Sequence, residues 1–257
     1  MTTRTEHFEF GDEHPRLSID VPAGEVILEP GPGGRMTVAL DGPKADEFEV
    51  TASGGAVTVR YRDGKWLSGR SSVRIVATVP MGTDLDVQGA SLDVRSRVGL
   101  GSVRGRTASG DVSLTTATDV SIKSASGTVS VDVVTGDLRA SLASGDIRAG
   151  TIEGDLDISS ASGDVDVDAV SGRVEVSTAS GDLRIGCCSG SDLACKTVSG
   201  DASIGVPRGT RADLDVKTLS GDVRLPPGGS HDIPDEDRVR RRLTFKSVSG
   251  DIELKSV

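Results

Sequence analysis

A glycine recurs every nine residues through the middle of this chain, and no other feature limits its fold as strongly. Each glycine lies in a triplet of the Ser-Gly-Asp type. The glycines are Gly127, Gly136, Gly145, Gly154, Gly163, Gly172, Gly181 and Gly190. Counting from the residue before glycine, the fourth and sixth positions are always apolar, and a polar fifth position separates them in all but the last unit, as in Val165, Asp166 and Val167.

This alternation predicts a β-strand with one buried and one solvated face, because successive side chains of a strand point to opposite sides. The triplet predicts a tight turn, since glycine tolerates positive φ and Asp or Ser can bond the turn backbone. A helix is excluded, because glycine every nine residues among β-branched residues costs too much helix propensity. Each unit is therefore a short strand and a corner.

A second period, twice as long as the first, is superimposed on it. The ninth position alternates between small residues (Ala143, Ala161, Ala179) and bulky ones (Ile152, Val170). Like residues stack on like if one coil contains about 18 residues, as two nine-residue sides. One such coil cannot fold alone, so stability must come from stacking. We predict an all-β, single-domain parallel β-solenoid; a three-sided coil of the same length stays open.

Residues 1–80 differ from the repeat. They contain five of the six aromatic residues, namely Phe8, Phe10, Phe48, Tyr61 and Trp66, and strands are expected at 7–10, 16–21, 25–29, 35–40, 47–52, 56–62 and 73–79. We interpret residues 1–80 as an irregular N-terminal aromatic cap of the same domain, because an open terminal coil would recruit other chains. Residues 81–257 form the repeat solenoid.

Two departures from the repeat occur within 81–257. A Val-Pro-X-Gly-Thr corner is used twice, at 79–83 and at 206–210, and a Pro-, Gly- and charge-rich stretch at 226–241 predicts a surface loop. Residues 249–257 form a complete unit. We expect this unit to be the last, open coil of the stack, with Ile252 and Leu254 pointing inward.

Charge argues against several classes of partner. The net charge is −10 and the isoelectric point about 4.8, which disfavours nucleic acid and anionic membranes. The basic run from Arg238 to Arg242 follows four acidic residues, so it predicts a solvated, self-compensating loop. The N-terminal residues lack a signal-like apolar stretch and no run reaches 18 apolar residues, so a cytoplasmic location without membrane insertion is expected.

The aspartate after each glycine is the strongest candidate for chemistry. On one edge of such a two-sided coil, Asp146, Asp164 and Asp182 would stack, with Asp201 next. A hard cation such as Ca²⁺ would relieve their repulsion. Calcium β-rolls, however, have a glycine-richer signature. We therefore expect these carboxylates to accept turn N–H bonds, with no metal site, and keep calcium as the alternative.

Other candidates have structural explanations. The outward residues Ser130/Arg148/Asp166/Arg184 and Arg139/Asp157/Glu175 are expected to pair across strands. Cys187, Cys188 and Cys195 are expected at inward positions as small apolar residues, and the histidines at 7, 14 and 231 are too distant in sequence for a zinc site. Nucleophile, zinc-protease and phosphate-loop motifs are missing from the sequence. We therefore expect no enzyme activity, no catalytic residues and no cofactor.

Corner-and-strand segments carry a resemblance to a known family. They are ASGDV (108–112), ASGDI (143–147), ASGDV (161–165), ASGDL (179–183), LSGDV (219–223) and VSGDI (248–252). Over nearly its whole length the chain resembles the bacterial β-strand-repeat "putative adhesin" family, a domain family of unknown function. The resemblance implies a fold and no activity.

The functional expectation is a non-enzymatic scaffold or protein-interaction, adhesin-like solenoid. The alternative is a carbohydrate- or calcium-binding surface module. A protein partner or self-association is expected, including a tail-to-tail dimer through the C-terminal coil, because an open parallel coil presents unpaired backbone groups and an apolar layer.

Overall fold

A computed structural model describes residues 2–10, 14–62, 72–226 and 240–257 of the chain. In these residues it contains 23 β-strands and one short 3-10 segment, so the prediction of an all-β chain is confirmed. None of the helical structure in the described residues is long and apolar enough to cross a membrane. Contacts divide the chain into two units, Met1–Asp132 and Val133–Val257, which we describe separately. The predicted single domain, with its change of character near residue 80, stays a prediction.

The first unit mixes strand directions. Antiparallel ladders join β1 to β4, β4 to β7 and β5 to β6, whereas β2, β3, β8, β9 and β10 pair in parallel with their neighbours. The elements are β1 (Thr2–Glu9), β2 (Arg16–Asp20), β3 (Ala23–Pro30), β4 (Arg35–Gly42), η1 (Ala45–Glu47), β5 (Phe48–Ser53), β6 (Ala56–Tyr61), β7 (Ser72–Val79), β8 (Thr83–Ser96), β9 (Leu100–Ser109) and β10 (Val112–Ser126). All seven strands expected before residue 80 are present; β1 begins five residues earlier than expected, and the other ends differ by at most two residues.

The N-terminal part of this unit has an aromatic contact in its core. Phe48 is fully buried, and its ring meets Tyr61 edge-on at a centroid distance of 5.4 Å. Trp66 lies outside the described residues. The Val-Pro-X-Gly-Thr corner forms as predicted: Gly82 has a φ of 80°, and both the amide and the hydroxyl of Thr83 donate to the Pro80 carbonyl. This is the geometry of a type II turn, which requires positive φ at its third residue.

The second unit is a regular stack of parallel strands. One ladder runs β12–β14–β16–β18 and another β13–β15–β17–β19, and partners such as Leu138 and Leu156 are 18 residues apart. The elements are β12 (Leu138–Ser144), β13 (Ile147–Ile152), β14 (Leu156–Ser162), β15 (Val165–Val170), β16 (Val174–Ser180), β17 (Leu183–Cys188), β18 (Asp192–Ser199), β19 (Ala202–Val206), β20 (Arg211–Ser220), β21 (Val223–Arg224), β22 (Arg240–Ser249) and β23 (Ile252–Ser256). Strand β11 (Val129–Val134) contains the division between the units.

The fourth and sixth positions point inward as predicted, but the ninth position does so on only one side of the coil. Ile152, Val170 and Cys188 are buried ninth-position residues. The stacked alanines Ala143, Ala161 and Ala179 are exposed instead, and position eight is buried before them. In the strands that contain these alanines, burial alternates strictly from position four to the alanine at position nine, whereas the other strands break the alternation between positions six and nine.

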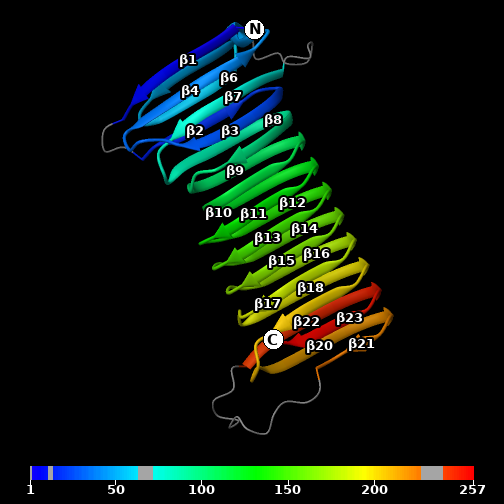
Figure 1. Cartoon of the computed structure of the whole chain (residues 1–257). Helices are drawn as coiled ribbons and strands as arrows, with labels where there is room; N and C mark the ends of the chain where they lie inside the picture. Colours follow the sequence, from blue (N-terminus) through cyan, green and yellow to red (C-terminus); the bar gives the residue numbers. More distant parts are fainter. Residues whose placement is uncertain (1, 11–13, 63–71, 227–239) are drawn as a thin grey trace. The chain divides into compact units, whose positions relative to one another are not determined.

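The C-terminal coil does not end the stack. Strand β22 lies between β18 and β20, and β23 lies between β19 and β21, as the red strands in Figure 1 show. The prediction that residues 249–257 form the open end is therefore wrong, although Ile252 and Leu254 do point inward. Of the predicted loop 226–241, residues 227–239 lie outside the described residues. Strand pairs join residues 29 positions apart, as between β20 and β22, as well as residues 18 apart, as between β13 and β15.

Candidate functional site

The aspartates that follow the glycines form a hydrogen-bonded column. Asp146 Oδ1 accepts the backbone N–H of Asp164 at 3.2 Å, Asp164 accepts that of Asp182 at 2.9 Å, and Asp182 accepts that of Asp201 at 2.9 Å. The column continues through the inserted coil to Asp251 at 2.8 Å and then to Asp222 at 2.9 Å. Every carboxylate of the column except that of Asp222, the last member, thus accepts a backbone N–H of the next coil through one oxygen.

The glycines of this column keep the corners closely stacked. Gly163 has a φ of 122°, and a Cβ there would lie 2.2 Å from the Gly145 carbonyl oxygen. Because backbone cannot move aside as a flexible side chain can, only glycine fits. Among the described residues no group of three or more His, Cys, Asp and Glu side chains is placed to hold a metal ion. The geometry assigns these aspartates to fastening the corners.

The outward charges pair differently from the prediction. The expected registers Arg148–Asp166–Arg184 and Arg139–Asp157–Glu175 are present. Arg139 and Arg148 nevertheless bond the aspartates of their own corners, Asp137 and Asp146, both at 2.8 Å. Of the expected cross-strand contacts, the described residues show Arg184 with Asp166, at 3.9 Å. Each of these two arginines therefore pairs with the aspartate two positions before it in the chain, and not with the charged residue on the neighbouring strand.

The cysteines lie near an unexpected buried arginine. Cys188 and Cys195 are buried, and burial raises the pKa of the Cys195 thiol to about 12; Cys187, expected to be buried, is half-exposed. Arg241 was expected in a solvated run but is buried, and its guanidinium donates to the carbonyls of Cys188 at 3.1 Å and Gly190 at 2.8 Å. These contacts join β22 to the corner before β18. They support the insertion of the C-terminal coil.

An apolar groove with basic side chains crosses one face of the second unit. It has a volume of about 530 Å³ and runs over the ends of β14, β16, β18, β22 and β20. One wall is the column of seventh positions, where Ser159 and Ser177 give way to lysines. The other wall is the column of ninth positions. The groove residues are Ser159, Ser160, Ser177, Thr178, Ala179, Lys196, Thr197, Val198, Lys217, Thr218, Leu219, Lys246, Ser247 and Val248.

The three lysines of the groove are direct neighbours on adjacent strands. Lys246 of β22 pairs in register with Lys196 of β18 on one side and with Lys217 of β20 on the other. Lys196 contacts Glu175 at 3.6 Å and Lys217 contacts Asp215 at 3.9 Å. Lys246 has no ion pair within the described part of the chain. A positive patch therefore lies on a chain whose net charge is −10.

The sequence pattern alone does not indicate that the three groove lysines are neighbours, and the reason is topological. Lys196 is a seventh-position residue of the repeat, but Lys217 and Lys246 follow irregular segments, and Lys246 reaches the middle of the cluster only because β22 is inserted. A search for lysine at position seven together with a bulky residue at position nine would have found all three. Their order in space could not be read from the chain.

The other candidate surface is the end of the stack. Among the described residues, β20 pairs with β22 and β21 with β23, and both keep a free edge. Val223 and Leu225 are 40% and 51% exposed, whereas Ile252 and Leu254 in the covered coil are 2% and 4% exposed. Leu214 and Val216 of β20 are half-exposed. One apolar layer of the core therefore meets solvent.

Comparisons with known proteins concern nearly the whole chain. A family model described as Toastrack DUF4097 matches residues 14–255. A solved structure of a "putative adhesin" from Bacteroides fragilis is 14% identical, with a TM-score of 0.42 and coverage of 98% of this chain and 97% of that one. Another from Parabacteroides merdae is 11% identical, with a TM-score of 0.43 and coverage of 97% and 95%. A "putative lipid binding protein" from Parabacteroides distasonis is 14% identical, with a TM-score of 0.36 and coverage of 97% and 96%. No curated protein matches.

Proposed function

Since the chain belongs to the Toastrack DUF4097 family, a β-solenoid-like family of unknown function, we propose that it is a non-enzymatic scaffold that works by protein interaction, including association with a second copy of itself. The observation that carries the proposal is the uncovered apolar layer at β20 and β21. An exposed edge with unpaired N–H and C=O groups and apolar side chains is a template for another chain.

We propose the end formed by β20 and β21 as the self-association surface, in place of the C-terminal coil. A two-fold axis perpendicular to the stack sets β20 antiparallel to β20 of the second copy. Centred on Val216, this pairing places Asp215 opposite Lys217 twice and Leu214 opposite Thr218. Side chains directly opposite share one face of an antiparallel pair, so the charges attract on the outward face, while Val216 meets its own copy and Leu214 meets Thr218 on the inward face. The edge is thus complementary to itself.

A charge swap on the intact chain tests this association. Asp215→Lys places like charges opposite each other at both symmetry-related positions, where an opposite-charge pair contributes about 0.2–1 kcal/mol. We expect at least about a tenfold weaker dimer by light scattering and sedimentation at several concentrations. The double variant Asp215→Lys/Lys217→Asp should restore association. A wild-type chain that stays monomeric at high concentration, or a double variant no better than the single, contradicts the surface.

We further propose how each coil is built and which residues form the N-terminal cap. Each coil from residue 81 onward consists of two nine-residue sides, and residues 1–80 close the other end. The 18-residue pairing offset supports the first statement, and the antiparallel ladders of β1, β4 and β7 support the second. Deleting β1 should produce concentration-dependent aggregation if this region is a cap.

The absence of enzyme activity is part of the same proposal. Its support is that the aspartates of the repeat already bond the backbone and form columns, so they do not converge on one point. We also propose a cytoplasmic location, supported by the three free thiols Cys187, Cys188 and Cys195. Fractionation of the producing cell, with thiol labelling before and after lysis, tests the location.

A further inference from the structure

The lysine groove on β18, β22 and β20 has two walls of different chemistry. Along the seventh positions stand Lys196, Lys246 and Lys217. Along the ninth positions stand Val198, Val248 and Leu219, all exposed. Residues two positions apart on a strand are separated by about 6.7 Å, so a cationic column runs beside an apolar column at that distance.

The cationic column favours an anionic occupant. Like charges on directly paired strand positions destabilise a sheet, and here three lysines occupy paired positions on adjacent strands whose backbones are about 4.8 Å apart. Lys246, in the middle, has no ion pair in the described part of the chain, and the other two have long contacts to exposed carboxylates. An occupant with several acidic groups in a row would relieve this repulsion, whereas a single acidic group would face only part of the column.

The repeat distance of the columns selects the shape of the occupant. An α-helix lying along the stack advances about 5.4 Å per turn, which differs from the strand spacing by only about 0.6 Å. An extended peptide in the same direction repeats each face about every 6.7 Å, and it loses register within two strands. Lysine stems are long enough to absorb the smaller difference. Adjacent stripes of a helix also match a charged and an apolar column side by side.

From this match we propose that the groove binds an acidic amphipathic α-helix of a protein partner. Its acidic residues, one per turn, face Lys196, Lys246 and Lys217, and its apolar stripe packs on Val198, Val248 and Leu219. The groove volume of about 530 Å³ accepts the apolar side chains, while the helix backbone lies above the rim. The groove shares β20 with the edge proposed for self-association, whereas Lys196 and Lys246 lie on β18 and β22, outside that edge.

The test uses the full-length protein and a synthetic helical peptide of about 18 residues, which makes five turns. The probe carries leucine at i, i+4, i+7 and i+11 with glutamate one turn apart in the adjacent stripe, and a hydrocarbon staple on the far side keeps it helical. Two control peptides replace every glutamate by glutamine, or scramble the order. We expect the acidic peptide to bind at least about tenfold more tightly than either control by fluorescence anisotropy, with weaker binding as NaCl increases.

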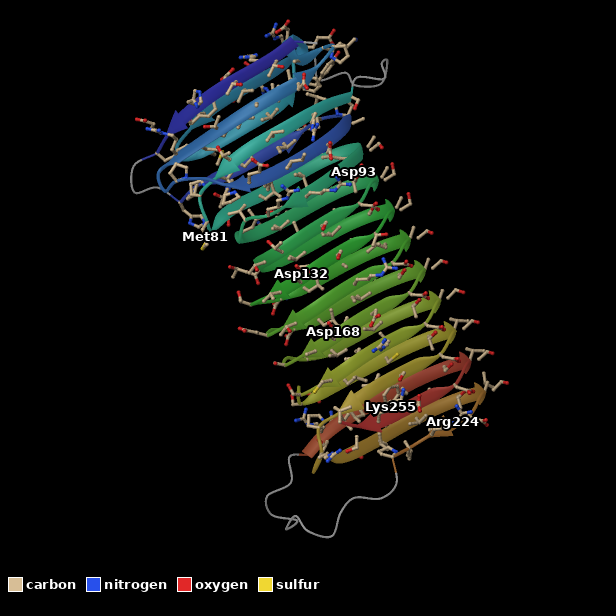
Figure 2. All side chains as sticks on the ribbon, viewed as in Figure 1. Met81, Asp93, Asp132, Asp168, Arg224 and Lys255 are labelled. Carbon is tan, nitrogen blue, oxygen red and sulfur yellow. The ribbon has the colours of Figure 1, made fainter. Side chains whose placement is uncertain are left out.

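Protein variants assign the binding to the groove. Lys196→Gln and Lys246→Gln should each weaken it about 2- to 5-fold, as expected for exposed ion pairs, and Lys246→Glu by more. Lys255→Gln is the matched control, because Lys255, which Figure 2 labels on β23, is as exposed as Lys196 and is not among the groove residues. Lys217 is not varied, since it belongs to the self-association edge. Asp215→Lys should leave peptide binding to the Lys196 and Lys246 end intact.

Three results would overturn the proposal. The first is no binding of the acidic peptide up to a concentration of about 1 mM. The second is equal binding of the three peptides, or an equal effect of Lys255→Gln and Lys246→Gln. The third is tighter, lysine-dependent binding of monomeric dodecyl phosphate, which would assign the groove to a small anionic amphiphile.

Discussion

The inward and outward assignment of the repeat can be tested with two adjacent residues on β15. Val167 is fully buried, and Asp166 beside it faces outward at 3.9 Å from Arg184. Val167→Asp removes a buried side chain that contributes about 1.5–3 kcal/mol. Holding the new carboxyl neutral at pH 7, about three pH units above its unfolded pKa, costs about 4 kcal/mol more. The sum approaches the whole stability of an ordinary domain.

The expected result is loss of cooperative folding in the second unit for Val167→Asp, and little change for Asp166→Val. The exposed Asp166–Arg184 pair contributes at most about 1 kcal/mol, and valine favours a strand. Urea unfolding followed by circular dichroism measures both. The Val167→Asp penalty should shrink as the pH falls towards 4, because the buried carboxyl has a raised pKa and the unfolded chain then becomes protonated as well. If Asp166→Val is the more destabilised variant, the register is wrong and every inward assignment with it.

Three further results are expected. Gly163→Ala should destabilise the second unit by about 1–3 kcal/mol, because alanine is strained at a φ of 122° and its Cβ meets a carbonyl oxygen. The control Gly33→Ala should be nearly neutral, because the space around Gly33 is open. Thermal melts of both variants check this. Asp164→Ala should lower the stability by about 1–2 kcal/mol through the lost bond to the Asp182 N–H, and millimolar Ca²⁺ should not change the Tm relative to EDTA. The control Asp168→Ala, on the exposed side of β15 (Figure 2), should leave the stability unchanged. A large calcium-dependent rise in Tm would refute the structural assignment of the aspartates. Burial would raise the pKa of Asp84, but the Ser102 N–H, His14 and Arg16 lower that pKa below its ordinary value. The stabilisation by Asp84 is therefore present above about pH 4 and is lost as the pH falls through the folded pKa. The Tm difference between wild type and Asp84→Asn should accordingly be present at neutral pH and vanish in acid.

Local structure could be predicted from the sequence because its causes are local. Alternation of apolar and polar residues decides which face of a strand is buried, and a glycine between serine and aspartate decides where the chain turns. Val165, Asp166 and Val167 have the predicted burial, and the aspartates have the predicted role as acceptors of turn N–H groups. The repeated Pro-Gly-Thr corner has the same turn at Pro80 and at Pro207.

The order of the coils was decided by the tertiary structure alone. Corners of the Ser-Gly-Asp type bond the next coil in the same way whether that coil is 18, 29 or 50 residues away along the chain, so the local pattern does not specify which coil stacks on which. The chain between β21 and β22 is long enough for β22 and β23 to enter the stack ahead of β20 and β21. This insertion moves the open edge to β20, buries Arg241 and brings Lys196, Lys246 and Lys217 together. Both surfaces proposed for binding follow from it, because a surface made by neighbouring coils depends on long-range pairing that a local repeat pattern does not encode.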